Sequence, residues 1–230
     1  DSHSVVAKEL WVGGKVATSL LDTPASVSVV TEKEIEQRSA STTEEVLQYT
    51  PGVITDFYGT DDRNDYLKIR GFQATTYRDG LTLGSSKQPR FERFGQGFVS
   101  YGSFDHVEAG IDVGDALNEK ETLAYRFTGK IQSSEREYDY SKDDNGFVMG
   151  GLTWEPTAFT SATVILDHLK RDSTPNSGGY PLDDEYSRSA FYGEPGFNYH
   201  DVERTSVTGN VTHDFDNGFV LRSNLRYSEL

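Results

Sequence analysis

The chain has no cysteine among its 230 residues. Disulfide bonds, thiolate metal sites and cysteine nucleophiles are therefore excluded. It also lacks any apolar run of the roughly 18 residues that a membrane-spanning helix requires. The first ten residues, DSHSVVAKEL, contain neither a basic leader nor an apolar core. We therefore do not interpret them as an uncleaved signal peptide.

Positive charge is scarce in the sequence. There are 22 Lys and Arg against 37 Asp and Glu, so the formal net charge is -15. This excess of acidic residues argues against a nucleic-acid partner, which requires a basic surface. Aromatic residues, in contrast, are abundant, with 13 Tyr and 13 Phe. The mean hydropathy of -0.60 is that of a soluble chain. A transmembrane β-barrel has a similarly low value, because only every second residue of its strands faces lipid.

The N-terminal part of the chain predicts a small α+β unit. Residues 1–20 show no clear periodicity, and PASVSVVT (24–31) predicts a short strand. Thr31 begins TEKE, a capping box that predicts a short helix, and STTEEVLQYTPG repeats this device from Ser41 or Thr42. GVITDFYGT and DDRNDYLKIRGF each predict a strand joined to a loop. In the second of these, Leu67 and Ile69 should share a buried face before Gly71 ends the run.

From Phe91 onward, strand-like segments of about ten residues follow one another. In HVEAGIDV the apolar residues Val107, Ala109, Ile111 and Val113 alternate with polar residues, as in a strand with two different faces. Seven segments show such patterns: GQGFVSYG, HVEAGIDV, YRFTGKIQ, FVMGGLTW, SATVILDHL, SVTGNVTHDF and FVLRSNLRYS. We expect about seven antiparallel strands that are joined in sequence.

Two all-β architectures are consistent with this alternation, an outer-membrane β-barrel and a soluble β-sandwich. Short connections such as EPTAF and DFDNG contrast with a long connection between Asp172 and Glu203. Short turns at one rim and long loops at the other are typical of outer-membrane barrels. Full charges in mid-strand, at Lys130 and Arg222, also favour the barrel, because a water-filled lumen accommodates them.

Four segments resemble the plug domain of TonB-dependent outer-membrane receptors. TPASVSVVTEKEI, EEVLQYTPGV, LKIRGF and DGL occur in that family's order and spacing, between Leu21 and Leu83. SKQPRFERFGQGFVSYGSFD is similar to the start of the family's barrel. Among these proteins, the chain is most similar to ferric-siderophore receptors, particularly those for hydroxamates.

The resemblance implies a fold and a mechanism. A plug would lie inside a transmembrane antiparallel barrel of 22 strands, of which this chain carries about seven. A ferric siderophore would bind between the plug apex and the extracellular loops. The protein TonB, with ExbB and ExbD, would pull an N-terminal box and displace part of the plug. No covalent chemistry takes place in such a protein, so we do not expect an enzyme.

The resemblance also implies a setting. The protein would be a multi-pass barrel in the outer membrane of a Gram-negative bacterium. It would contact outer-membrane lipid and lipopolysaccharide, and we expect it to be a monomer.

The chain departs from the family pattern in two respects. Ser85 and Ser86 lead directly into Lys87, although the family's plug normally continues for a further segment at this point. Seven strands, moreover, cannot close around a plug, and open sheet edges are unfavourable in lipid. We therefore expect the intact receptor to contain more plug and more strands. The predicted domains are an N-terminal energy-coupling segment (1–20), a plug that is incomplete after Ser86 (21–90) and the first barrel strands with their loops (91–230).

Aromatic and arginine side chains near predicted tips are the candidate ligand contacts, because an aromatic wall with a few donors suits a bulky, roughly neutral ferric hydroxamate. Tyr180, in GGYPL, is the first choice, since this segment resembles the place where hydroxamate receptors position an aromatic. The alternative is that several of these residues only form turns or pack the loops. Arg70, in IRGF, is instead expected to form an ion pair within the plug or with the barrel. The candidate contacts are Tyr180, Tyr58, Arg63, Tyr77, Phe57, Tyr186 and Tyr192.

The segment SVVA (Ser4, Val5, Val6 and Ala7) is either the TonB box or an ordinary linker. A TonB box would add an extended strand to a sheet edge of TonB. The five histidines show no metal-ligand spacing. We expect no cofactor, because iron would arrive already wrapped by its chelator. The remaining alternatives are another cargo, such as haem, cobalamin, a catecholate siderophore or a sugar, and a receptor that signals to a transcription regulator.

Overall fold

The structure is a computed structural model that describes residues 9–10, 18–19, 27–40, 42–55, 66–74, 77–78, 81–82, 87–136, 139–175, 189–194 and 196–230. The chain divides into two compact units, Asp1–Ser85 and Ser86–Leu230. The predicted domain boundaries at residues 20 and 90 remain predictions.

Two short helices lie in the first unit, α1 (Glu32–Arg38) and α2 (Thr43–Leu47). Both begin where the capping pattern predicts them, since the side chains of Thr31 and Thr42 accept hydrogen bonds from the backbone at the third helical position. At Thr42 the capping box is complete, because the Glu45 carboxylate accepts a hydrogen bond from the Thr42 backbone N–H in return. Neither helix, nor any other in the described part of the chain, is long and apolar enough to cross a membrane.

The strands of the first unit are only two residues long and pair within three small antiparallel sheets. One sheet contains β3, β4 and β5, and two further sheets are hairpin pairs, β1 with β2 and β6 with β7. The bounds are β1 Glu9–Leu10, β2 Thr18–Ser19, β3 Val53–Ile54, β4 Lys68–Ile69, β5 Phe72–Gln73, β6 Tyr77–Arg78 and β7 Leu81–Thr82.

The glycine corner after LKIR is the turn of the β4–β5 hairpin. Arg70 and Gly71 have φ values of 50° and 88°, as a two-residue turn of the primed type requires. Leu67 is 5% exposed, but Ile69 is 44% exposed, so the expected shared buried face is wrong at Ile69. The reason is that β4 ends at Ile69 and the turn follows immediately. Arg70 accordingly lies in the turn itself, where its N–H donates to Gly52 O at 2.7 Å, and not in a strand as predicted.

The strand predicted at residues 24–31 is wrong over its described part. Residues 27–31 belong to no strand. The last of them, Thr31, instead accepts the first hydrogen bond of α1 from Ile35 N at 3.0 Å. Strand formation needs a partner edge, and β-prone residues alone do not supply one.

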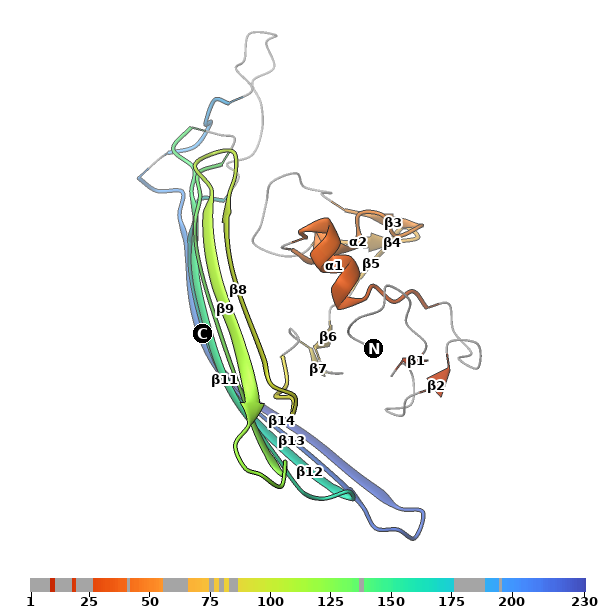
Figure 1. The fold of residues 1–230 in the computed structure, drawn as a ribbon. Helices are drawn as coiled ribbons and strands as arrows, with labels where there is room; N and C mark the ends of the chain where they lie inside the picture. Colours follow the sequence, from red (N-terminus) through yellow and green to blue (C-terminus); the bar gives the residue numbers. More distant parts are fainter. Residues whose placement is uncertain are drawn as a thin grey trace. The chain divides into compact units, whose positions relative to one another are not determined.

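The second unit is a single antiparallel sheet of seven strands, as the alternating pattern predicts. The strands follow one another as a meander in the order β8 to β14, and the sheet is long and curved (Figure 1). Because all seven strands belong to one sheet, the sandwich alternative is excluded for the described residues. The bounds are β8 Phe94–Tyr101, β9 Val107–Ala116, β10 Leu123–Ser133, β11 Asp143–Thr157, β12 Thr160–Ser173, β13 His200–Asp214 and β14 Val220–Glu229.

The meander places its connections alternately at two ends of the sheet. We call one end the loop end, where residues 102–106, 134–142 and 174–199 connect the strands. The other is the turn end, where residues 117–122, 158–159 and 215–219 connect them. The predicted separation of long loops from short turns is therefore confirmed, except that the connection 102–106 at the loop end is short.

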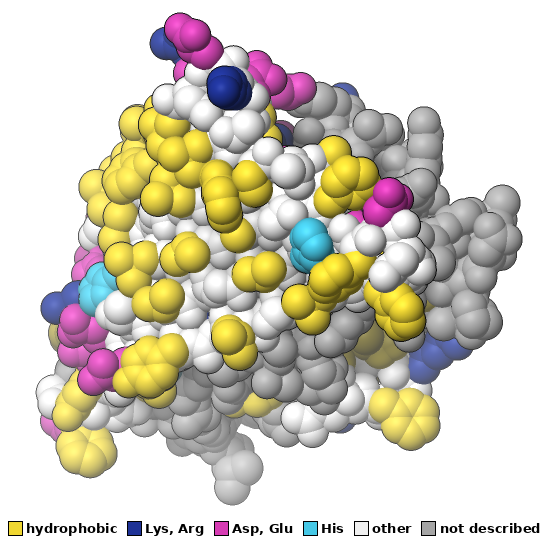
Figure 2. Space-filling view, turned by 90° about the horizontal axis from the view of Figure 1, so that it is seen from below, with side chains coloured by type: hydrophobic (Ala, Val, Ile, Leu, Met, Phe, Trp, Pro, Cys, Tyr) yellow, Lys and Arg dark blue, Asp and Glu magenta, His cyan; other side chains and the backbone are white. Residues whose placement is uncertain are grey.

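The strand register gives the sheet one apolar and one polar face. On the apolar face, cross-strand pairs such as Leu152 with Val164 and Leu166 with Val207 join large side chains that are 42–57% exposed. Figure 2, seen from the turn end, shows hydrophobic side chains spread over the surface. So large an exposed apolar surface indicates contact with lipid or with a partner. Exposed apolar residues on this face include Ile111, Phe127, Val148, Leu152, Trp154, Val164, Leu166, Val207, Leu225 and Tyr227.

The polar face is crossed by ion pairs and hydroxyl pairs between neighbouring strands. Lys130, one of the predicted mid-strand charges, pairs with Glu108 at 2.5 Å. Charged groups that lie far from bulk water are stable only when they are paired and hydrogen-bonded. Further pairs on this face are Arg126–Asp112, Arg204–Asp167, Thr153–Thr163, Arg226–Thr208 and Ser228–Ser206.

Candidate functional site

The loop end is the part of the sheet where the sequence predicts ligand contacts. Hydrogen bonds between the three connections hold their described residues together. These bonds join the first connection to the second and the second to the third, although the connections are far apart in the sequence.

The first connection presents an aromatic side chain on a strained backbone. Phe104 and Asp105 have φ values of 61° and 49°, a region that a bulky residue such as Phe rarely enters. Glu135 N donates to Phe104 O at 2.8 Å, which ties this turn to the second connection. The Phe104 side chain is 52% exposed. Strain of this kind is concentrated at functional sites, so Phe104 is a candidate contact.

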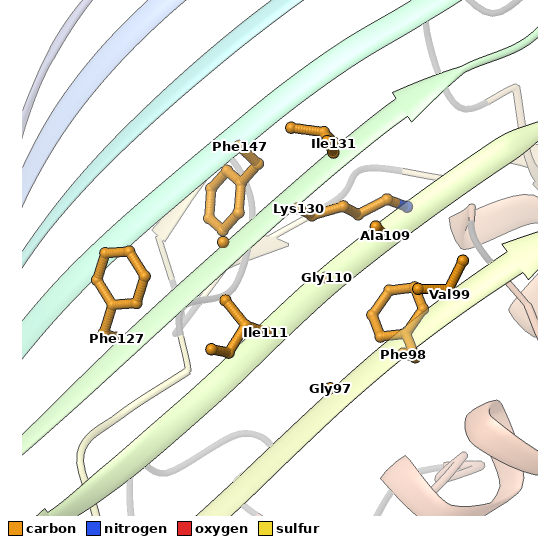
Figure 3. Close-up of a pocket in the computed structure, with 11 residues that line it drawn as sticks. Gly97, Phe98, Val99, Ala109, Gly110, Ile111, Phe127, Lys130, Ile131 and Phe147 are labelled. Carbon is orange, nitrogen blue, oxygen red and sulfur yellow. The ribbon is translucent and has the colours of Figure 1, made fainter.

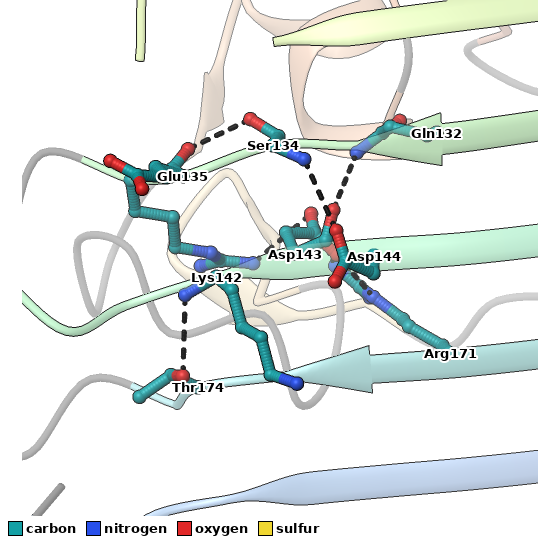
Figure 4. Close-up of polar contacts among 9 residues, drawn as sticks. Gln132, Ser134, Glu135, Lys142, Asp143, Asp144, Arg171 and Thr174 are labelled. Atoms are coloured by element: carbon teal, nitrogen blue, oxygen red, sulfur yellow. Dashed lines mark hydrogen bonds and ion pairs between the residues drawn. The ribbon is translucent and has the colours of Figure 1, made fainter. Parts of the chain in front are cut away.

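The second and third connections are joined at two levels. Asp139 N donates to Ser189 O at 2.8 Å. Closer to the strands, Thr174 N donates to Lys142 O at 2.9 Å, and Lys142 N donates to the Thr174 hydroxyl at 3.2 Å. The two bonds between Lys142 and Thr174 fix the start of the long third connection against the second, and Figure 4 shows the one to the Thr174 hydroxyl.

Asp143 holds two guanidinium groups at the base of the second connection. Arg171 Nε and one terminal nitrogen donate to its two carboxylate oxygens at 2.9 and 3.0 Å. Arg136 lies 3.2 Å from the same carboxylate. A bidentate arginine–carboxylate pair has a fixed geometry, so the ends of β11 and β12 are held in register (Figure 4).

Lys142 supplies positive charge next to this network. Its ammonium donates to the Asp172 carboxylate at 2.5 Å. This hydrogen bond raises the pKa of Lys142 above its ordinary value, and the Asp144 and Asp201 carboxylates add to the effect. The neighbouring carboxylates therefore favour the charged form of this lysine.

Exposed aromatic side chains accompany these polar groups. They are between 39% and 78% exposed, so their ring surface is open to a ligand. Aromatic rings bury much area at a low cost in conformational entropy, which makes them effective binding anchors. The set consists of Phe104, Tyr140, Tyr192, Phe197 and Tyr199.

The predicted contact residues can be located only in part. Tyr192 lies in the third connection and is 39% exposed. Tyr77 lies in β6, where it pairs with Thr82, but its side chain is outside the described set. Tyr180, Tyr186, Phe57, Tyr58 and Arg63 all lie outside the described residues, as do Ser4, Val5, Val6 and Ala7.

Four of the five exposed aromatics at the loop end are not among the seven candidate contacts: Phe104, Tyr140, Phe197 and Tyr199. Phe197 and Tyr199 lie in the aromatic-rich third connection. Tyr140 lies in SEREYDYSKDDN, which is one of the longer connections in the sequence. Its position in a long loop could have marked it as a candidate contact. Phe104 carries no such signal, because its exposure depends on the positive φ of a five-residue connection.

A pocket of about 620 Å³ lies over β8, β9 and β10, but it differs in character from the loop end (Figure 3). Its lining is mostly apolar-face residues, including Val99, Ile111, Phe127 and Ile131, and small residues leave it open. It belongs to the exposed apolar face and offers few groups to orient a polar ligand.

The described residues contain no group of three or more His, Asp and Glu that could hold a metal ion. The expectation that the protein has no cofactor remains a prediction.

A family model matches the first part of the chain. The family model "TonB-dependent Receptor Plug Domain" matches residues 19–110. The resemblance predicted from the four motifs is thereby confirmed.

Two curated relatives cover nearly the whole chain at low identity. The "Ferrioxamine B receptor" of Salmonella typhimurium (strain SL1344) is 26% identical, over 93% of this chain and 38% of its own length. The "Ferrichrome outer membrane transporter/phage receptor" of Escherichia coli (strain K12) is 24% identical, over 98% of this chain and 37% of its own length. The chain thus spans just over a third of the length of these relatives. The first alignment extends over 267 residues, more than the 230 of the chain, so the relative carries insertions.

A solved structure has the same fold. The ferripyoverdine receptor of the outer membrane of Pseudomonas aeruginosa matches with a TM-score of 0.85 and 20% identity, over 96% of this chain and 36% of that one. The predicted fold class, a mainly β barrel wall preceded by a small α+β plug, is confirmed. The large sheet of the described residues has seven strands, and the additional strands expected in the intact protein remain a prediction.

Proposed function

We propose that this chain, which is part of a TonB-dependent receptor by its plug match and its fold, belongs to a protein that imports a ferric siderophore across the outer membrane. One observation carries the proposal. The chain combines a match to the plug family at residues 19–110 with a seven-stranded meander that has one apolar and one polar face. A plug without a barrel has no passage to close, and a barrel wall without a plug gives no gated transport.

The proposed cargo is a ferric hydroxamate. Ferrioxamine and ferrichrome, which give two relatives their names, are chelates of this type. Such a complex is bulky and roughly neutral, so it suits the exposed rings of the loop end together with a few donors. Iron would enter and leave inside its chelator. It is cargo, and the protein needs no metal ligands or cofactor of its own.

The proposed partners follow from the energy source. TonB, with ExbB and ExbD, would act on the N-terminal segment from the periplasmic side. The apolar face would contact outer-membrane lipid, and polar groups near the loop end would contact lipopolysaccharide. We propose that the receptor is a multi-pass monomer, since barrel closure satisfies its strand edges internally.

The cargo class is testable by a binding titration of the full-length protein. Ferric hydroxamate, catecholate and carboxylate chelates, together with haem and cobalamin, are titrated while intrinsic fluorescence quenching is followed. We expect tight, saturable binding of the hydroxamate and at least tenfold weaker binding of the others, about 1.4 kcal/mol or more. Preference for a catecholate or for haem would overturn the hydroxamate proposal, whereas binding of none would overturn the import function.

Tyr180 remains the first proposed ligand contact. Replacement of Tyr180 by Ala should weaken ferric hydroxamate binding by about tenfold to a hundredfold, which is roughly 1.4–2.8 kcal/mol, because an aromatic anchor at the centre of a site is lost. Isothermal titration of the folded variant measures the change. Tyr227→Ala, the same substitution on the apolar face of β14, is the control and should bind normally. Unchanged affinity in Tyr180→Ala would remove this residue from the site.

A further inference from the structure

The segment that leads into the sheet lies across its polar face. Lys87, Gln88 and Pro89 contact three consecutive strands in turn. Lys87 Nζ donates to Asp112 of β9 at 2.8 Å, and Gln88 O accepts from Arg126 of β10 at 3.1 Å. Pro89 is buried, and its ring lies over Gly151 of β11. Each residue of this short segment is therefore bound to a different strand of the wall.

The centre of this arrangement is the carboxylate of Asp112, which is 8% exposed. One oxygen accepts from Arg126 Nε at 2.8 Å and from the Thr128 hydroxyl at 2.9 Å. The other accepts from Arg126 at 2.6 Å and from Lys87 at 2.8 Å. Four donors thus converge on one carboxylate. The Arg126 guanidinium, 5% exposed, also lies 4.9 Å from the centre of the Phe94 ring, so its position is determined from both sides.

Glycine at position 151 makes the close approach of Pro89 feasible. A Cβ atom there would lie 3.1 Å from Cγ and 3.2 Å from Cδ of Pro89. Either contact is tighter than ordinary van der Waals packing, so a side chain at position 151 would require the Pro89 ring to shift. The sheet therefore offers space for the Pro89 ring at Gly151. It also offers the Asp112 carboxylate to the Lys87 ammonium and the Arg126 guanidinium to the Gln88 carbonyl.

We propose that Lys87, Asp112 and Arg126 form an anchor that fixes the end of the plug-side chain to the barrel wall. This inference rests on the proposed function, in which TonB pulls from the N-terminal side. A pull that displaces part of the plug requires a fixed point beyond the displaced part, and the anchor provides it at Lys87–Pro89. Asp112 is the positioning residue, because it orders both cations and binds no ligand itself.

A nitroxide on a single introduced thiol gives a direct test. These 230 residues contain no cysteine, and any cysteine elsewhere in the full-length protein is first replaced by serine. A nitroxide is attached at Gln88→Cys in the full-length protein. The side chain at this position is exposed, and the anchoring hydrogen bond uses only its backbone oxygen. Electron paramagnetic resonance in detergent micelles, without siderophore or TonB, then reports the mobility of the segment. We expect a slow spectrum from the otherwise unchanged protein.

Three variants decide the result. Lys87→Met, which leaves the Arg126–Asp112 pair intact, should shift the spectrum towards fast motion, and Asp112→Asn should shift it further. Glu108→Gln is the matched control, because it breaks the ion pair with Lys130 on the same face of β9, and it should leave the spectrum slow. If Lys87→Met and Asp112→Asn both kept the slow spectrum, the proposal would be overturned. It would also be overturned if Glu108→Gln shifted the spectrum towards fast motion as much as they do.

Pulling experiments test the mechanical role. The protein is held at its C-terminus and pulled from its N-terminus by force spectroscopy. The last rupture before the sheet yields should require less force in Lys87→Met than in the unchanged protein or in Glu108→Gln. Equal rupture forces in all three would overturn the anchor as a mechanical stop. Neither measurement uses a ligand, so failure of ferric chelate binding would count against the proposed function alone.

Discussion

Gly114→Ala should prevent normal assembly of β8, β9 and β10. A Cβ atom at this position would lie 2.5 Å from the Phe94 ring and 2.7 Å from Tyr125 O. The ring cannot simply swing away, because the Arg126 guanidinium lies against it. The carbonyl belongs to the neighbouring strand and cannot move without disrupting the β9–β10 ladder. We expect a loss of about 3 kcal/mol in the free energy of unfolding, at the upper end of the range for overpacked sites.

The measurement is urea unfolding of the full-length protein in micelles, with gel mobility before and after heating as the test of barrel formation. Gly150→Ala is the matched control. This glycine lies in β11, and an added Cβ would have no atom within 4 Å. The control should fold like the unchanged protein. If Gly114→Ala were as stable as Gly150→Ala, the close packing of Phe94 over β9 would be wrong.

Deletion of residues 1–8 should abolish siderophore uptake and spare siderophore binding. The deleted part contains SVVA, the proposed TonB box, and strand addition to TonB requires an extended segment there. Without that contact no work can be transmitted to the plug. The loop end and the sheet do not include these residues, so the affinity for the ferric chelate should be unchanged.

Uptake of radioactive iron by cells and binding to purified receptor measure the two effects separately. A control replaces residues 1–8 with an equally long Gly/Ser segment, which keeps the length but not the β-prone residues. It should fail in uptake as completely as the deletion does. Normal uptake by either variant would show that SVVA is ordinary linker.

Part of the loop end was predictable from composition and part was not. The third connection is rich in Tyr and Phe, and Tyr192 was predicted to be a contact from this alone. The bonds that join the connections, such as Asp139 with Ser189, link residues far apart in the chain. No local pattern predicts them, because they depend on which strands are neighbours. The exposure of Phe104 likewise depends on a backbone conformation that its residue type does not favour.

The anchor illustrates the same limit. No sequence pattern distinguishes Lys87, Asp112 and Arg126 from charged residues that are exposed to solvent. They meet because Thr128 lies opposite Asp112 in the β9–β10 register, which places Arg126 on the same face and within reach of it. A slip of one residue would turn Arg126 to the apolar face.

The sequence by itself determined the plug match, the capped helices, the number and order of the sheet strands and the division of their residues between two faces. These features are local, because side chains alternate with period two and short connections join neighbouring antiparallel strands. Only the tertiary structure decided which charges pair, where the chain is fastened to the wall and which aromatics are exposed at the loop end. Those outcomes depend on register and on backbone torsions, and many different tertiary arrangements satisfy the same alternation of residues.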